Sequence, residues 1–394
     1  MIRKVNEQVS KKTELFLDEK YIGDSPAKIP NWRLIDSPDR PDCVESEEGI
    51  EILTNKNNVK YVRTPEERFE NLKDFPYEPH YALIEDLRMH YVDEGSESGE
   101  VILLLHGQPS WSYLYRKMIP ILAKEKYRVI AADLIGMGRS DKPIEIGFHT
   151  YENHVAIIKK FITALKLENI TFFGQDWGGI MGLRVVGDQP MSFARVIAAN
   201  TQLPVIFKGM NPYLVPNPIK IDCSLKKIDF EQFASEQMSR RNRKIFFPPK
   251  QQKWFQRWIN YCLIHPNLKA SQILQVATIN NLSDDELTAY DAPYPSFVYK
   301  AATRTFPSMV AAIEQKNEDA WKNLGEYNKP FLYLGGEEDP LLGTLGVQKT
   351  FTFHIPGTKG QAHERYPNAG HYIQDDIGIK LAKKVISFIK ANPI

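Results

Sequence analysis

Hydrophobic residues gather into short, uninterrupted runs in the middle and last parts of the chain, and polar turns separate these runs. Runs of this kind are typical of strands buried on both faces of a parallel sheet. They are VILLLHG (101–107), RVIAADLIGMG (128–138), ITFFGQ (170–175), RVIAAN (195–200) and PFLYLGG (330–336). The segment LRMHYVDEG (87–95) predicts one earlier strand.

Amphipathic segments lie between and after these runs. Residues 152–167 (ENHVAIIKKFITALKL) space their apolar side chains as one face of a helix, and residues 380–391 (KLAKKVISFIKA) predict a closing helix. Strands that alternate with helices indicate an α/β protein with a mostly parallel, doubly wound sheet.

Two stretches interrupt this alternation. Residues 1–55 are polar, contain several prolines and show little periodicity, which predicts a mobile extension or, alternatively, a strap across the main domain. Residues 203–310 contain helix-like pieces and a basic stretch between the sixth and seventh strands of the expected sheet. An insertion there lies over the edge where such sheets bind ligands. We therefore interpret it as a helical cap on a core formed by residues 56–202 and 311–394.

Composition and charge narrow the class of protein. The 394 residues carry 50 basic and 49 acidic side chains, and a net charge of +1 argues against a dedicated nucleic-acid-binding protein. The three cysteines lack CxxC spacing, so we expect neither a disulfide framework nor a metal site. No apolar run reaches the length of a membrane span, and the N-terminus lacks the apolar stretch of a signal peptide. We expect a cytoplasmic protein.

A glycine-rich turn follows the strand ITFF and precedes the helix-like IMGLRVV. This turn reads GQDWGG (174–179). Strand, glycine-bracketed turn and helix form the layout of a nucleophile elbow, which usually reads G-x-S-x-G. Here Asp176 occupies the place of the serine.

An acid and a histidine follow this turn in the order of an α/β-hydrolase triad. Asp339 lies just after the strand PFLYLGG, and His371 lies in NAGHYIQDD near the C-terminus. Each residue alone is weak evidence, since loop aspartates and surface histidines are common. Glu337 and Glu338 precede Asp339, and they are the alternatives for the acid.

The segment HGQPSWSYLYR (106–116) follows the strand VILLL. In an α/β hydrolase the turn after this strand supplies one N–H group of the oxyanion hole, and the residue after the nucleophile supplies the other. These groups are the backbone amides of Gln108 and Trp177. His106 is expected to shape the turn and to take no part in catalysis. No dinucleotide cofactor is expected, because DLIGMGRSDKP lacks GxGxxG.

An aspartate at the elbow predicts a particular chemistry. A carboxylate can attack a saturated carbon and form an ester on the enzyme. His371 would then activate water against this ester, and the oxyanion hole would serve that second step. The alternative is an elbow that has lost catalysis.

Several longer motifs resemble the haloalkane dehalogenases, and in particular the branch whose acid follows the seventh strand. They are HGQPSWSYLYRKMIP (106–120), GQDWGG (174–179), ANTQLP (199–204), LTAYDAPYPSFVYKAATRTFP (287–307) and IPGTKGQAHERYPNAGHYIQDD (355–376). The resemblance covers residues 60–204 and 255–394. It implies an α/β-hydrolase fold, a cap between strands 6 and 7, and hydrolysis of a small haloalkane by water to alcohol and halide without a cofactor.

The resemblance also implies the role of each site residue. Asp176 matches the nucleophile, His371 the base, and Asp339 the residue that orients the base. Another branch places its acid after the sixth strand, where this chain has Asn200, which cannot act as a carboxylate.

Two tryptophans match the residues that bind the departing halide. Trp177 matches the first, and the second comes from the cap, where Trp258 is our choice and Trp254 the alternative. An indole N–H donates and never accepts, and its apolar ring excludes water, which suits a halide. The competing interpretation of Trp258 is an ordinary buried residue of an amphipathic helix.

Three rival functions stay open. An epoxide hydrolase uses the same aspartate together with cap tyrosines, for which Tyr261, Tyr290 and Tyr299 are available. A cofactor-free oxygenase of the luciferase type and a non-catalytic receptor are the others. The segment 205–254 looks longer than in the family, and no oligomeric state is predicted.

Overall fold

A computed structural model describes four ranges of the chain, namely residues 49–205, 222–237, 249–313 and 316–394. Most of the predicted N-terminal extension and much of the segment 205–254 lie outside these ranges. None of the helices within them is long and apolar enough to cross a lipid bilayer.

An eight-stranded sheet forms the centre of the molecule, in the order β11-β10-β9-β8-β5-β6-β4-β3. Its strands are β3 (His80–Ile84), β4 (Leu87–Gly95), β5 (Val101–Leu105), β6 (Arg128–Ala132), β8 (Ile170–Gln175), β9 (Phe193–Ala199), β10 (Phe331–Gly336) and β11 (Glu364–Tyr366). The strands from β6 to β11 pair in parallel, whereas β4 pairs antiparallel with both β6 and β3. The predicted doubly wound, mostly parallel sheet is confirmed.

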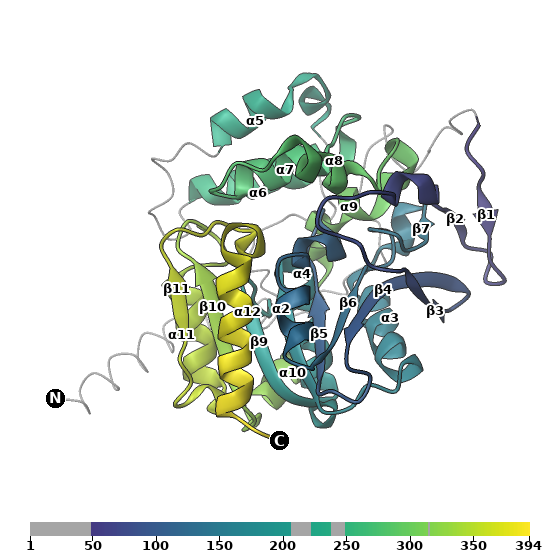
Figure 1. The fold of residues 1–394 in the computed structure, drawn as a ribbon. Helices are drawn as coiled ribbons and strands as arrows, with labels where there is room; N and C mark the ends of the chain where they lie inside the picture. Colours follow the sequence, from purple (N-terminus) through teal and green to yellow (C-terminus); the bar gives the residue numbers. More distant parts are fainter. Residues whose placement is uncertain (1–48, 206–221, 238–248, 314–315) are drawn as a thin grey trace, which may run out of the picture.

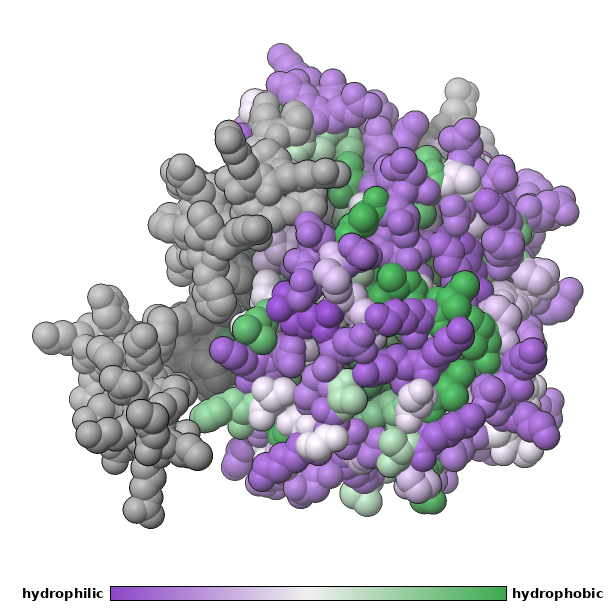
Figure 2. Space-filling model, turned by 60° about the vertical axis from the view of Figure 1, so that its left-hand side comes forward, coloured by the Kyte–Doolittle hydropathy of each residue, from purple (hydrophilic) through white to green (hydrophobic). Residues whose placement is uncertain are grey.

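Helices cover both faces of this sheet (Figure 1). They are α2 (Ile119–Lys124), α3 (Tyr151–Ala164), α4 (Asp176–Asp188), α10 (Lys316–Leu324), α11 (Leu345–His354) and α12 (Ile373–Ala391). Helices α3 and α10 pack against α4, while α2 packs against α12. This double cover explains why every residue of β8 and β10 is buried. The face in Figure 2 is mainly hydrophilic, with smaller groups of hydrophobic residues.

A small second sheet, in the order β1-β2-β7, lies beside the main one. Its strands are β1 (Leu53–Thr54), β2 (Lys60–Val62) and β7 (Lys142–Pro143). The described end of the predicted extension is thus paired with the segment that leads into the core.

Helices between β9 and β10 form a cap at one end of the main sheet (Figure 1). They are η8 (Cys223–Lys227), α5 (Phe230–Gln237), α6 (Pro249–Ile264), α7 (Ala270–Ala277), α8 (Asp284–Asp291) and α9 (Ala301–Thr305). Strands β9 and β10 are the sixth and seventh strands of the main sheet in chain order. A cap between strands 6 and 7 is therefore confirmed.

A buried ionic network fastens the cap to the core. Ser283 and Glu286 form a capping box at the start of α8. Glu286 also pairs with Arg116, whose guanidinium lies 2.5 Å from the Glu286 carboxylate and 2.7 Å from that of Asp375, at the start of α12. The hydroxyl of Tyr290 donates to Asp375 at 2.6 Å. Because isolated buried charges are costly, these partners hold α8 against the loop after β5.

Candidate active site

Asp176 stands at the junction between β8 and α4, as the nucleophile elbow predicts. Its φ of +49° lies in the left-handed region, which aspartate tolerates better than most residues. The Asp176 N–H donates to the carbonyl of Asn200 at 3.0 Å, and the Asp176 carbonyl accepts from the hydroxyl of Thr201 at 2.8 Å. Hydrogen bonds thus hold both the backbone N–H and the backbone carbonyl of Asp176 in this turn.

Two glycines allow the segments around Asp176 to approach closely. A Cβ on Gly107 would lie 2.4 Å from the Cβ of Asp176, and one on Gly178 would lie 2.3 Å from the carbonyl oxygen of His106. Either side chain would push apart the turn after β5 and the start of α4. These contacts explain the glycine in the turn after β5 and the first glycine after Asp176 in the elbow.

Two backbone N–H groups point at the Asp176 carboxylate. Gln108 N–H donates to Oδ1 at 3.0 Å, and the backbone N–H of Trp177 acts to lower the pKa of the same carboxyl group. These are the two amides expected for an oxyanion hole. His106 is fully buried, with Nε2 accepting from Leu134 N–H at 3.0 Å and Nδ1 donating to the carbonyl of Gly107 at 2.9 Å. Its contacts are those of the structural residue predicted from the sequence.

The predicted acid and histidine are paired in the structure. His371 Nδ1 lies 2.8 Å from Asp339 Oδ2, and Oδ1 of Asp339 accepts from the N–H groups of Leu341 and Leu342 at 2.9 and 3.0 Å. Burial alone would raise the pKa of Asp339, but His371 and these amides lower it below its ordinary value. Glu337 is exposed, so the structure favours Asp339 as the partner of the histidine.

His371 faces the elbow with its other nitrogen. Nε2 lies 3.6 Å from Asp176 Oδ2. Burial would lower the pKa of His371, but the carboxylates of Asp339 and Asp176 raise it above its ordinary value. Burial raises the pKa of Asp176, while His371 and the two backbone N–H groups act in the opposite direction. The three residues therefore form one connected electrostatic unit.

Sequence reasoning missed two residues that hold His371. Gln175 donates through its amide to the His371 carbonyl at 3.1 Å and lies 3.2 Å from Nε2 of the ring. Asn200 donates to the carbonyls of Gly370 and His371 at 2.7 and 3.0 Å, and its oxygen accepts from Gly336 N–H at 2.8 Å. A signal existed for both, since each is an amide side chain at the carboxyl end of an apolar strand.

Trp177 follows Asp176 directly in the chain. The residue is 5% exposed, and its ring packs edge-on against Phe306, with 5.8 Å between the ring centroids. Among the described residues, no acceptor meets its indole N–H.

Trp258 lies on α6 and contacts other cap residues. Its ring is 6.1 Å from that of Phe233 and 6.5 Å from that of Tyr261. One turn further along α6, burial raises the pKa of the Cys262 thiol while the nearby side chain of Gln108 acts to lower it, so this part of the helix approaches the turn after β5. The side chain of Trp254, the alternative donor, lies outside the description.

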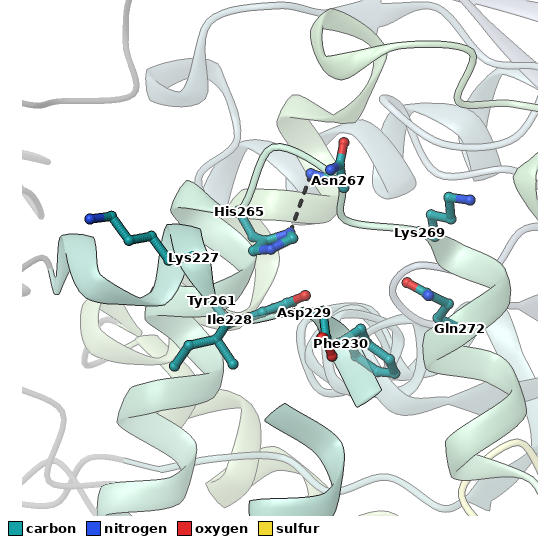
Figure 3. A pocket seen from close by; sticks show the side chains of 9 residues that line it. All are labelled: Lys227, Ile228, Asp229, Phe230, Tyr261, His265, Asn267, Lys269 and Gln272. Carbon is teal, nitrogen blue, oxygen red and sulfur yellow. Dashed lines mark hydrogen bonds between the residues drawn. The ribbon is translucent and has the colours of Figure 1, made fainter. Parts of the chain in front are cut away.

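A hollow of about 550 Å³ lies within the cap. Figure 3 shows the side chains that line it. It is lined by Lys227, Ile228, Asp229, Phe230, Tyr261, His265, Asn267, Lys269 and Gln272. Tyr261 is stacked between Phe233 and His265, at centroid distances of 4.4 and 4.3 Å. The hollow therefore belongs to the aromatic core of the cap and shares no residue with the triad.

The tyrosines considered for epoxide chemistry are dispersed. Tyr290 donates its hydroxyl to Asp375, Tyr261 lines the cap hollow, and Tyr299 belongs to a separate apolar cluster with Val62. An epoxide hydrolase needs two hydroxyls that converge on one oxygen. This arrangement does not provide such a pair. Among the described residues, no group of three or more His, Cys, Asp or Glu side chains could hold a metal ion.

Comparisons with known proteins show the family of this chain. A family model for the alpha/beta hydrolase fold matches residues 100–376. The chain is 38% identical to a haloalkane dehalogenase of Psychrobacter cryohalolentis, covering 85% of this chain and 100% of that one. It is also 38% identical to a haloalkane dehalogenase of Mycobacterium marinum, over 83% and 99% of the two chains.

A solved structure of a haloalkane dehalogenase is also similar to this chain. The tetrameric haloalkane dehalogenase DpaA of Paraglaciecola agarilytica superposes with a TM-score of 0.64 at 28% identity. The match covers 84% of this chain and 98% of that one.

Proposed function

The chain belongs to the haloalkane dehalogenase family of α/β hydrolases, and from this we propose that it hydrolyses haloalkanes to alcohol and halide through a covalent ester on Asp176. One observation carries the proposal. The two oxygens of the Asp176 carboxylate have different surroundings, since Oδ1 accepts a backbone N–H bond and Oδ2 faces His371.

The first step follows from this difference. Oδ2 attacks the sp³ carbon, a C–O bond forms, and the carbon–halogen bond breaks with its electron pair leaving on the halide. Oδ1 keeps its hydrogen bond from the Gln108 N–H and becomes the carbonyl oxygen of the ester.

The second step uses the same contacts. His371 Nε2 takes a proton from water, and the resulting hydroxide attacks Cγ of Asp176. The negative charge develops on Oδ1, where the Gln108 N–H already points and where the Trp177 N–H is the proposed second donor. Collapse of this intermediate breaks the bond from Cγ to the ester oxygen, and His371 returns the proton to the departing alcohol. Asp176 then loses the second proton of the water to solvent and is a carboxylate again. Asp339 stabilises the protonated imidazole in between.

Trp177 is proposed as a donor to the departing halide. We expect Trp177→Phe to slow the first step roughly 10–100-fold, because it removes a hydrogen bond to a charged group worth about 1.5–3 kcal/mol. The phenyl ring retains the apolar contact with Phe306. Rapid-mixing measurement of halide release gives the rate of this step.

Trp321→Phe is the matched control, since Trp321 stacks on His354 at 4.1 Å, away from the elbow. Equal rates in the two variants would contradict the role of Trp177. The same measurement on Trp258→Phe and Trp254→Phe identifies which cap tryptophan is the second donor.

A substrate comparison tests the reaction itself. We expect bromide release from 1,2-dibromoethane and no consumption of styrene oxide by the purified full chain. Ion chromatography measures bromide, and chiral gas chromatography measures the diol. Diol formation without bromide release would replace the dehalogenase with an epoxide hydrolase.

A further inference from the structure

We propose that Asp376 is a positioning residue for His371, because its carboxylate ties the loop that carries the base to a turn of the cap. The inference rests on the proposed function and names a part of the site that the triad does not include. It concerns Asp376 in the first turn of α12 and the cap residues 277–280 between α7 and α8.

Three backbone N–H groups converge on this one carboxylate. Oδ1 of Asp376 accepts from Ile279 and from Asn280, each at 2.9 Å, and Oδ2 accepts from Gly370 at 2.7 Å. Two donors therefore come from the cap, and the third comes from the residue directly before His371. A carboxylate is suited to this task because it accepts only and has two oxygens.

Further contacts join the segment that contains Gly370, His371 and Asp376 to cap residues 277–280. The N–H of His371 itself donates to the carbonyl of Ala277 at 2.8 Å. The amide of Asn280 donates to the carbonyl of Asp376 at 3.0 Å. A Cβ on Gly370 would lie 2.5 Å from the Ala277 carbonyl oxygen, so only glycine permits this approach. The base is thus bonded through its own backbone to the cap.

Ordinary helix capping does not account for these bonds. An acidic residue in the first turn of a helix commonly bonds the free N–H groups of its own helix. The three donors to Asp376 belong to other segments, and two of them are about 96 residues away in the chain. Their common effect is to fix the loop of His371 relative to the cap.

The two catalytic steps depend on this loop to different degrees. Asp176 is held by β8, α4 and the backbone of Asn200, none of which bonds Asp376. His371 acts on water only in the second step. Loosening the loop should therefore slow hydrolysis of the ester and leave its formation unchanged.

Asp376→Asn tests this expectation in the full chain. Asparagine has the same shape, but one oxygen is replaced by an amide that cannot accept, so at least one of the three N–H bonds is lost. We expect the halide burst to keep its rate within about twofold, while alcohol formation slows by roughly 10–100-fold, since small misplacements have effects of this size. Mass spectrometry should show the ester accumulating during turnover.

Asp284→Asn is the matched control, because Asp284 is an exposed acid in the first turn of α8, and we expect wild-type rates from it. Asn280→Ala is a milder second variant that removes the bond to the Asp376 carbonyl, and it should slow the same step to a smaller extent. The positioning role would be overturned if Asp376→Asn and Asn280→Ala left the rates of both steps unchanged. It would also be overturned if these variants slowed the halide burst and ester hydrolysis equally. Absence of halide release by the wild type would instead overturn the proposed function.

Discussion

The variant Asp176→Asn is expected to release halide at least about 10⁴-fold more slowly than the wild type, the scale on which enzymes lose activity when a nucleophile is removed. The amide lacks the negative charge that displaces a halide from saturated carbon. Asparagine also tolerates the positive φ of this turn and has the same shape, so the elbow should keep its structure. Halide release over hours, with a bromoalkane in excess, measures the effect.

Gln189→Glu is the comparison. It makes the reverse exchange, of an amide for a carboxylate, at Gln189, which follows the last residue of α4 at the end of the helix opposite Asp176. We expect its activity to equal that of the wild type. The nucleophile would have to be sought elsewhere if Asp176→Asn retained a tenth of wild-type turnover.

His371→Gln should separate the two steps. Glutamine cannot take a proton from water, so each active site should release one halide and then stop with the alkyl group attached to Asp176. Alcohol formation should fall by at least about 10⁴-fold, while the halide burst persists. Mass spectrometry of the intact protein should show the added alkyl group, and peptide mapping should place it on the segment that contains Asp176.

His80→Gln is the control for this experiment, because His80 is exposed on the edge strand β3 and we expect no adduct in it. An unmodified His371→Gln protein that still releases halide repeatedly would exclude the two-step scheme.

The strands that carry the site could be predicted because each is a continuous apolar run. β5, β8 and β10 begin and end within two residues of the segments read from the sequence. Their carboxyl ends carry the oxyanion turn, the elbow and the acid, so the order of the motifs already implied one site. A parallel strand that is covered on both faces needs apolar side chains along its whole length, so its sequence pattern is easy to recognise.

The strands that were missed lack that pattern. β3 reads HYALI and lies at the edge of the sheet, where it alternates between exposed and buried residues. β11 has only three residues, ERY, at the opposite edge. Short or edge strands depend on pairing with a neighbour more than on their own sequence.

The residues that support His371 were missed for a different reason. Gln175, Asn200 and Asp376 act by bonding the backbone of a loop that is far away in the chain. Sequence motifs report the residue types a reaction needs, but hydrogen bonds to distant backbone groups depend on how two loops meet. The amides at the ends of β8 and β9 could be noted in the sequence, but the backbone groups that they bond become visible only when the fold brings these loops together.

The 3.6 Å separation between Oδ2 of Asp176 and Nε2 of His371 makes the pKa of His371 depend on the charge of Asp176. In the resting enzyme the negative charge on Asp176 contributes to the raised pKa of His371. In the proposed mechanism, conversion of that carboxylate into an ester removes this charge, so the pKa of His371 falls at the step in which a neutral base is required. Release of the alcohol would then restore the charge on Asp176 and the raised pKa of His371.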